Sequence, residues 1–220
     1  MNDSYAALLD ARRCLLSKEM SPIFSTTSEI VCEVGCGHGH FLTAYAAAHP
    51  DRVCIGLDLV SERVERARRK RDRAGLANLH FLRAEARLFM ETLPAIARIS
   101  GLFLLFPDPW PKLRHQKHRI LQAGFLDLVA DRATPGCRLA FRTDYLPYFS
   151  DAQSIIRNHP RWRLVQEPWP FEYATVFQQR AASFASLIAV RRSCKSTCSE
   201  EETSPGKPVV PQTTTINFEG

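Results

Sequence analysis

The sequence lacks the features that mark several large classes of protein. No apolar run approaches the ~20 residues that a membrane-spanning helix needs, so no transmembrane segment is predicted. The first residues show no basic stretch followed by an apolar core, so no secretory signal is predicted either. The 10 glycines and 14 prolines follow no strict repeat, which excludes fibrous proteins. With 45% hydrophobic and 24% charged residues, the 220-residue chain has the composition of a globular protein.

Cysteine occurs in a pattern that excludes two further classes. The seven cysteines include no CxxC pair and no Cys/His cluster with the spacing of zinc ligands, so no metal site is predicted. Their number is odd, and several lie within apolar runs, as buried free thiols usually do. Unpaired thiols fit a reducing compartment, so we expect a cytoplasmic protein with no membrane association.

Positive charge is present in excess and is unevenly distributed. The net charge is +6, and the residues from Arg191 onward contribute equal numbers of acidic and basic groups. The whole excess therefore lies in residues 1–190. A compact basic domain favours a polyanionic partner such as nucleic acid. The alternative is a basic protein without such a partner.

Apolar runs of strand length alternate with helix-like stretches, which predicts an α/β fold with a parallel sheet and helices on both faces. In such sheets ligands bind beyond the C-terminal ends of the strands. Ser61 is expected to cap a helix, and Pro135-Gly136 to turn the chain. The expected strands are 29–35, 53–59, 79–84, 101–107, 137–143, 162–166 and 183–190, and the expected helices are 41–49, 61–74, 86–93, 121–133 and 145–158.

Composition divides the chain into three parts. Residues 29–192 carry the alternating pattern, and residues 1–28 precede it as an N-terminal segment. Residues 193–220 are rich in Ser, Thr, Pro and Glu and contain few apolar residues. Such a segment buries too little surface to offset its ordering entropy, which predicts a disordered tail.

A glycine-rich loop follows the first expected strand. Gly35, Gly37 and Gly39 are preceded by Glu33, and Asp58 ends the next strand. Glycines permit positive φ and close approach of a ligand, and Asp58 lies where ribose hydroxyls would bind. A dinucleotide fingerprint needs a glycine where this chain has His40, which disfavours a dehydrogenase. The negative charge of Glu33 suits the ammonium and sulfonium groups of S-adenosylmethionine; the alternative is that Glu33 closes its own loop.

The loop and strand together resemble the class I S-adenosylmethionine-dependent methyltransferases. This resemblance implies a Rossmann-like seven-stranded, mostly parallel sheet with the last strand antiparallel. Glu85, just past the third expected strand, could accept a hydrogen bond from the adenine amino group. An acidic residue at the start of a helix is the alternative interpretation of Glu85.

The fourth expected strand ends in a stiff segment, Phe106-Pro107-Asp108-Pro109-Trp110-Pro111. Alternating prolines fix φ and forbid a helix there. Asp108 can accept hydrogen bonds from base N–H groups, and an aromatic ring can stack on a base. Residues 112–119 then supply four Lys/Arg and two His, which indicates a contact surface for phosphates. The alternative is a solvated loop.

This segment closely resembles the bacterial TrmB-type tRNA (guanine-N7)-methyltransferases, whose hallmark is an F-x-DPW-x-K-x-RH-x-KRR run. Arg142-Thr143-Asp144-Tyr145 and the segment from Thr175 to Arg180 match as well, so the resemblance covers residues 30–190. It implies methylation of guanosine at N7, at position 46 in the variable loop of tRNA, by a monomer or homodimer. It assigns S-adenosylmethionine to Glu33, Gly35, Gly37, Asp58, Glu85 and Asp108, catalysis to Asp108, the substrate to Lys112, Asp144, Thr175 and Gln178, and RNA contacts to Arg114, His115, Lys117 and Arg119.

The chain departs from the family pattern at a few positions. Gln178 stands where the family has glutamate, and His118 replaces an arginine. Asp58 and Glu85 exchange carboxylate length with the commoner Glu and Asp. Two alternatives follow: a methyltransferase for another acceptor, or a non-catalytic RNA-binding protein on a degenerate methyltransferase fold.

Overall fold

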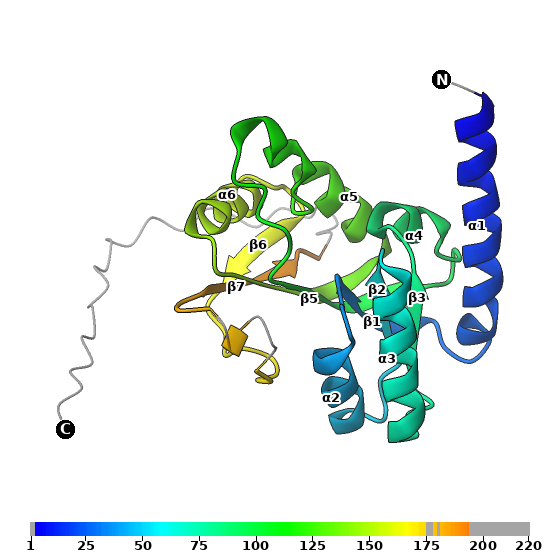
Figure 1. Ribbon diagram of the computed structural model, residues 1–220. Coiled ribbons are helices and arrows are strands. Elements are labelled where there is room, and N and C mark those ends of the chain that lie inside the picture. Colours follow the sequence, from blue (N-terminus) through cyan, green and yellow to red (C-terminus); the bar gives the residue numbers. More distant parts are fainter. Residues whose placement is uncertain (1–2, 175–177, 180, 194–220) are drawn as a thin grey trace, which may run out of the picture.

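A seven-stranded sheet forms the centre of the computed structural model, which describes residues 3–174, 178–179 and 181–193 (Figure 1). The strand order is β3-β2-β1-β4-β5-β7-β6, and β7 runs antiparallel to both of its neighbours. The predicted seven-stranded, mostly parallel sheet with an antiparallel last strand is therefore confirmed. The strands are β1 (Glu29–Val34), β2 (Cys54–Asp58), β3 (Leu79–Arg83), β4 (Arg98–Leu105), β5 (Ala133–Thr143), β6 (Trp162–Val165) and β7 (Ala185–Arg191).

Helices cover both faces of the sheet, because the central strands are apolar on both sides. Figure 1 shows α2 and α3 on one face and α4, α5, α6 and η1 on the other. A buried cluster lies under each set, with Phe41 and Phe81 in the first and Phe125 and Trp162 in the second. The helices are α1 (Asp3–Phe24), α2 (His40–Ala48), α3 (Ser61–Ala74), α4 (Ala86–Thr92), the 3₁₀ helix η1 (Leu113–His118), α5 (Ala123–Arg132) and α6 (Leu146–Arg157).

The N-terminal segment contains a 22-residue helix, α1, which the sequence analysis leaves unassigned. Leu16, Met20 and Ile23 are buried and join the larger core cluster, while Leu8 and Leu15 are exposed. The three buried residues have i, i+4, i+7 spacing, which is the helical signal in this segment. The N-terminal half of α1 projects beyond the sheet (Figure 1). No helix among the described residues is both long enough and apolar enough to cross a membrane.

Two local predictions are wrong. Pro135-Gly136 does not turn the chain but lies within β5, where the register shifts between Ile99 and Gly101 of β4. Such a bulge tolerates proline because the ladder needs no N–H at that point. Ser61 is the first residue of α3 rather than its cap, since Val60 occupies the cap position. The basic residues after Pro111 form η1, for which the sequence analysis predicted no helix.

Candidate functional site

The candidate site lies where the order of strands in the sheet changes direction, between β1 and β4. Strands β1, β2 and β3 follow one another outward, and β4 then pairs with the other side of β1. Val34 of β1 is paired with Leu104 of β4, so the loops that follow these two strands emerge side by side. Ligands of open α/β sheets bind at this kind of switch point. Both sequence motifs, the glycine loop and the Asp108 segment, therefore begin at the same edge of the sheet.

The glycine loop is open on the side of two of its glycines. Gly35 and Gly37 have φ of +78° and +53°, and a Cβ added to either would meet no atom within 4 Å. A Cβ on Gly39 would lie 2.5 Å from the ring of Phe81, and one on Gly56 would lie 2.6 Å from it. Gly39 and Gly56 are thus required for packing, whereas Gly35 and Gly37 leave space for a ligand.

Glu33 is a buried carboxyl group at the end of β1, with 3% of its surface exposed. Its Oε2 atom has no hydrogen-bond partner among the described residues. Burial, followed by repulsion from Asp58, raises the pKa of Glu33 to about 8. Burying a carboxyl oxygen without a partner costs free energy, which a cationic ligand would recover. Glu33 therefore fits a cofactor that carries an ammonium group.

Asp58 connects the end of β2 to the glycine loop. Its Oδ2 accepts a hydrogen bond from the Gly37 amide at 2.9 Å, and its Oδ1 accepts one from the Val60 amide at 2.8 Å. Arg63 lies 3.8 Å from Oδ2. Each carboxylate oxygen has a second lone pair, so these contacts leave acceptor capacity for a diol. The carboxylate that the sequence predicts to bind the ribose hydroxyls is thus fixed beside the open loop.

Glu85 acts as the N-cap of α4. Its Oε2 accepts a hydrogen bond from the Leu88 amide at 2.9 Å, which satisfies one of the free N–H groups at the helix start. The alternative interpretation of Glu85, an acidic helix-start residue, is therefore confirmed. The side chain is exposed, and its contact with adenine stays a prediction.

The Asp108 segment leaves β4 in a strained backbone conformation. Phe106 and Trp110 have φ of +49° and +42°, which L residues rarely adopt. The Phe106 amide donates to the Arg142 carbonyl at 2.7 Å, which anchors the first of the two strained residues to β5. Asp108 lies between them and is exposed. Strain of this kind persists only where the surroundings enforce it, and it clusters at functional sites.

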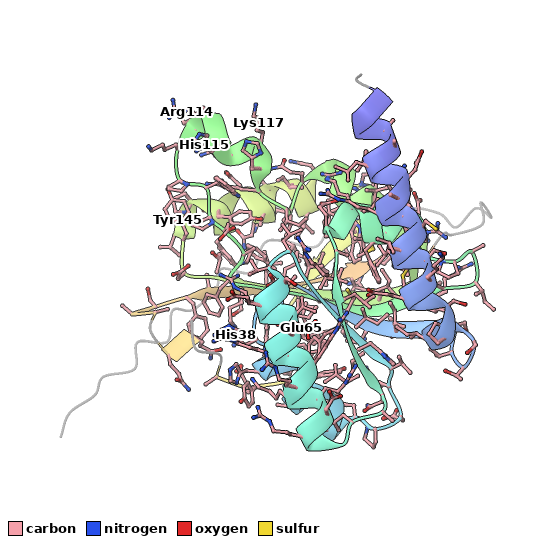
Figure 2. The ribbon with its side chains drawn as sticks, turned by 45° about the vertical axis from the view of Figure 1, so that its right-hand side comes forward. His38, Glu65, Arg114, His115, Lys117 and Tyr145 are labelled. Atoms are coloured by element: carbon pink, nitrogen blue, oxygen red, sulfur yellow. The ribbon has the colours of Figure 1, made fainter. Side chains whose placement is uncertain are left out.

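The basic residues after Pro111 separate into two groups. Lys112, Arg114 and Lys117 are exposed, and His115 packs its ring edge-on against Trp110, with 5.8 Å between centroids. Figure 2 shows the side chains of Arg114, His115 and Lys117 together on η1, pointing away from the body of the protein. These residues form the surface that the sequence predicts for RNA.

Arg119 belongs to the second group, and its predicted contact with RNA is contradicted. Only 1% of its side chain is exposed. The guanidinium pairs with Asp151 of α6 and donates to the Pro109 carbonyl at 2.8 Å. A group buried in this way cannot reach a phosphate without unfolding of its surroundings.

Arg142 is a buried site residue that the sequence analysis did not single out for a role. It lies at the end of β5, 4% exposed, with its guanidinium carbon 4.0 Å from the Trp169 ring centroid. Both oxygens of Glu172 accept from it, at 3.0 and 3.2 Å, and so does Oε1 of Gln178, at 2.9 Å. The signal was an arginine within the apolar run 137–143. Arg142 therefore holds Gln178 beside the strand that anchors the Asp108 segment.

The remaining predicted positions are partly described. Asp144 follows β5 and is exposed. Thr175 lies outside the described residues, as do residues 194–220 of the predicted disordered tail. Within the described part of the chain no cluster of His, Cys, Asp or Glu could hold a metal ion. The cysteines of that part, from Cys14 to Cys137, are all free thiols.

Comparison of the sequence with known proteins finds a matching family and similar relatives. The model of a family described as "Putative methyltransferase" matches residues 27–186. A tRNA (guanine-N(7)-)-methyltransferase of Mycobacterium avium is 30% identical over 178 residues, which cover 77% of this chain and 69% of the relative. A protein of the same name from Chromohalobacter salexigens is 32% identical over 151 residues, covering 69% of this chain and 61% of the relative.

Solved structures share the fold. A 16S rRNA (adenine(1408)-N(1))-methyltransferase from Catenulisporales acidiphilia, in a structure with its cosubstrate SAM, superimposes with a TM-score of 0.54. The identity is 19%, and the match covers 83% of this chain and 94% of the other. At this identity the likeness concerns the fold alone.

Proposed function

Because this chain belongs to the family of bacterial tRNA (guanine-N7)-methyltransferases, we propose that it methylates N7 of guanosine 46 in the variable loop of tRNA. The methyl donor is S-adenosylmethionine. The observation that carries the proposal is the meeting of two loops at the β1–β4 boundary. One is an open glycine loop next to a buried carboxyl group with one oxygen left without a partner, and the other presents an exposed aspartate beside a cationic helix.

Different residues of the chain bind the cofactor and the tRNA. Glu33 faces the cofactor's ammonium group, Asp58 accepts from ribose hydroxyls, and Gly35 and Gly37 let the cofactor lie against the backbone. Glu85, the N-cap of α4, accepts a hydrogen bond from the adenine amino group through its remaining acceptor capacity. Lys112 and the exposed residues of η1 attract the tRNA backbone, while Asp144 and the Arg142-bound Gln178 contact the target nucleotide.

The reaction needs little acid–base chemistry. S-adenosylmethionine supplies a methyl group on a positively charged sulfur. Guanine N7 has an in-plane lone pair and no proton, so it would attack the methyl carbon without a general base, and the electrons of the broken C–S bond would return to the sulfur, which leaves as a neutral thioether. Catalysis then depends on orientation and electrostatics. Asp108 holds the base through its N1 and N2 protons or stabilises the positive charge that develops on it.

N7 also constrains the form of the substrate. In A-form duplex RNA this edge of guanine lies in the narrow major groove, which side chains cannot read. The target must therefore be unstacked, or accessible within the tertiary core of the tRNA. Free thiols in the described part of the chain favour the reducing cytoplasm as the place of the reaction.

Two transcripts test the proposal directly. The purified protein is incubated with labelled S-adenosylmethionine and with tRNA transcripts that differ only in guanine or adenine at position 46. Label in the guanine transcript alone is the expected result. No label in either transcript, with cofactor binding intact by calorimetry, would shift the function to another methyl acceptor. Absence of cofactor binding would instead favour the non-catalytic alternative.

A further inference from the structure

Arg119 is surrounded by the segment that carries Asp108. Its Nε donates to the Pro109 carbonyl at 2.8 Å, and its Nη2 lies 3.5 Å from the Trp110 carbonyl. Nη1 pairs with Asp151 of α6. The Arg119 side chain thus connects Pro109 and Trp110, the two residues that follow Asp108, to helix α6.

Aromatic contacts fix the guanidinium from a further direction. Its central carbon lies 4.8 Å from the ring centroid of Tyr148 and 5.8 Å from that of Tyr145. The Tyr148 hydroxyl in turn accepts from the Leu121 amide at 3.1 Å, just beyond Arg119 in the chain. Helix α6 therefore holds both the guanidinium and the backbone next to it.

The backbone that Arg119 contacts is the one that needs support. Trp110 has φ of +42°, a conformation that costs free energy and persists only when other contacts impose it. Pro107, Pro109 and Pro111 carry no backbone N–H, so this segment offers few donors for hydrogen bonds of its own backbone. A guanidinium with five N–H donors in a rigid fork can bind carbonyls at two positions and a carboxylate at a third.

We propose that Arg119 and Asp151 form a positioning pair that holds the Pro109 and Trp110 carbonyls, and through them fixes Asp108 at the methyl-transfer site. The inference rests on the proposed function of Asp108. Arg119 acts on the reaction through the backbone and not through RNA, although it lies in the same cationic run as Arg114 and Lys117.

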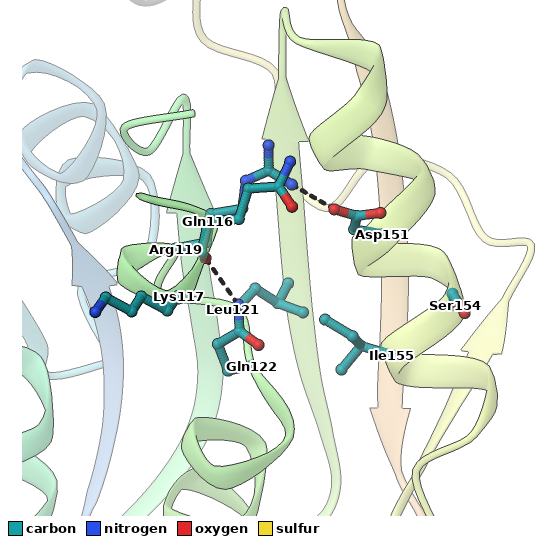
Figure 3. Close-up of a pocket in the computed structure, with 8 residues that line it drawn as sticks. All are labelled: Gln116, Lys117, Arg119, Leu121, Gln122, Asp151, Ser154 and Ile155. Carbon is teal, nitrogen blue, oxygen red and sulfur yellow. Dashed lines mark hydrogen bonds and ion pairs between the residues drawn. The ribbon is translucent and has the colours of Figure 1, made fainter. Parts of the chain in front are cut away.

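The surroundings of the pair allow it to be tested without destroying the fold. Arg119 and Asp151 line a cavity of about 300 Å³ between η1 and α6, together with Gln116, Leu121 and Ile155 (Figure 3). Asp151 is 51% exposed, so an asparagine at this position stays in contact with water. Asp151→Asn removes a negative charge, which by itself can only favour binding of a polyanion.

The experiment measures tRNA methylation and binding for Asp151→Asn and Arg119→Lys. Lysine keeps the charge but has no fork to reach two carbonyls and a carboxylate. We expect kcat to fall about tenfold in both variants, with tRNA affinity and its salt dependence close to those of the unaltered protein. Asp131→Asn on α5, which breaks a solvent-exposed ion pair with Arg161, is the control for loss of a surface carboxylate and should leave kcat unchanged.

A second measurement separates this inference from the proposed function. Amide hydrogen exchange across residues 106–119 should be faster in both variants, whatever the methyl acceptor is. Unchanged exchange and unchanged kcat in Asp151→Asn would overturn the positioning role. A loss of tRNA affinity and a weaker salt dependence in Arg119→Lys, with kcat intact, would return Arg119 to the RNA surface. Failure of the unaltered protein to methylate the guanine transcript would count against the proposed function alone.

Discussion

On the side of the β1–β4 boundary proposed for the cofactor, two carboxyl groups, Glu33 and Asp58, are buried, whereas on the side proposed for the substrate Asp108, Lys112 and Arg114 are exposed. Because these two carboxyl groups are buried, a change in side-chain volume or in protonation there should strongly affect stability and cofactor binding. The exposed charges act together over a distance and are screened by salt. Asp108 differs from the other exposed charges, because the strained and anchored backbone around it fixes its position as firmly as burial would.

Asp108→Asn tests that exception and should have the largest effect. The amide keeps the size of the side chain but loses the charge and half of the acceptor capacity. We expect kcat to fall on the order of 100-fold or more, with tRNA binding retained. Methylation rates at saturating tRNA and a binding assay measure the two quantities separately. Weak tRNA binding, or turnover near that of the unaltered protein, would contradict the assignment.

Gly37→Ala tests the open side of the glycine loop. The new Cβ would enter the space assigned to the cofactor, at a φ of +53° that costs alanine about 1–2 kcal/mol. We expect the Kd for S-adenosylmethionine to rise on the order of tenfold, measured by calorimetry. Gly75→Ala is the matched control, since Gly75 has φ of +64° and open space too, but ends α3. Equal losses of cofactor affinity in the two variants would show strain rather than contact.

Glu33 should make the stability of the cofactor-free protein depend on pH. The pKa of this carboxyl is about 8 in the folded protein against an ordinary value of 4.5, so the folded state keeps a proton that the unfolded chain has lost. The free energy of unfolding should therefore fall as pH rises from about 4.5 to 8. Glu33→Gln has no such proton, and its Tm should decline less over this range. Parallel Tm curves for the two proteins would place the pKa of Glu33 near its ordinary value.

The exposed cations should show the smallest effect at a single salt concentration. Replacing both Arg114 and Lys117 by glutamine should weaken tRNA binding a few-fold. It should also reduce the slope of log K against log salt by about one to two, if each side chain contacts one phosphate. Arg98→Gln, at the opposite end of β4, is the control. A slope equal to that of the unaltered protein would remove both residues from the phosphate contacts.

The sequence predicted the parts of the molecule that depend on neighbouring residues. Apolar runs ended by glycine or proline predicted the strands, because burial on both faces of a sheet requires such runs. Proline and glycine restrict or release the backbone locally, so the bend after β4 and the loop after β1 could also be expected. Helix α1 was missed because only three of its described side chains, Leu16, Met20 and Ile23, are buried, and its apolar spacing is correspondingly weak.

By itself, then, the sequence determined the fold class and the two segments that carry the site, since both follow from local patterns. The tertiary structure alone decided which of its glycines face ligand space and which face Phe81. It also decided that Arg119 is buried while Arg114 is exposed. It decided as well that Arg142 donates hydrogen bonds to Glu172 and Gln178. Neighbouring residues of one type receive different roles because burial and partners depend on segments that are distant in the chain.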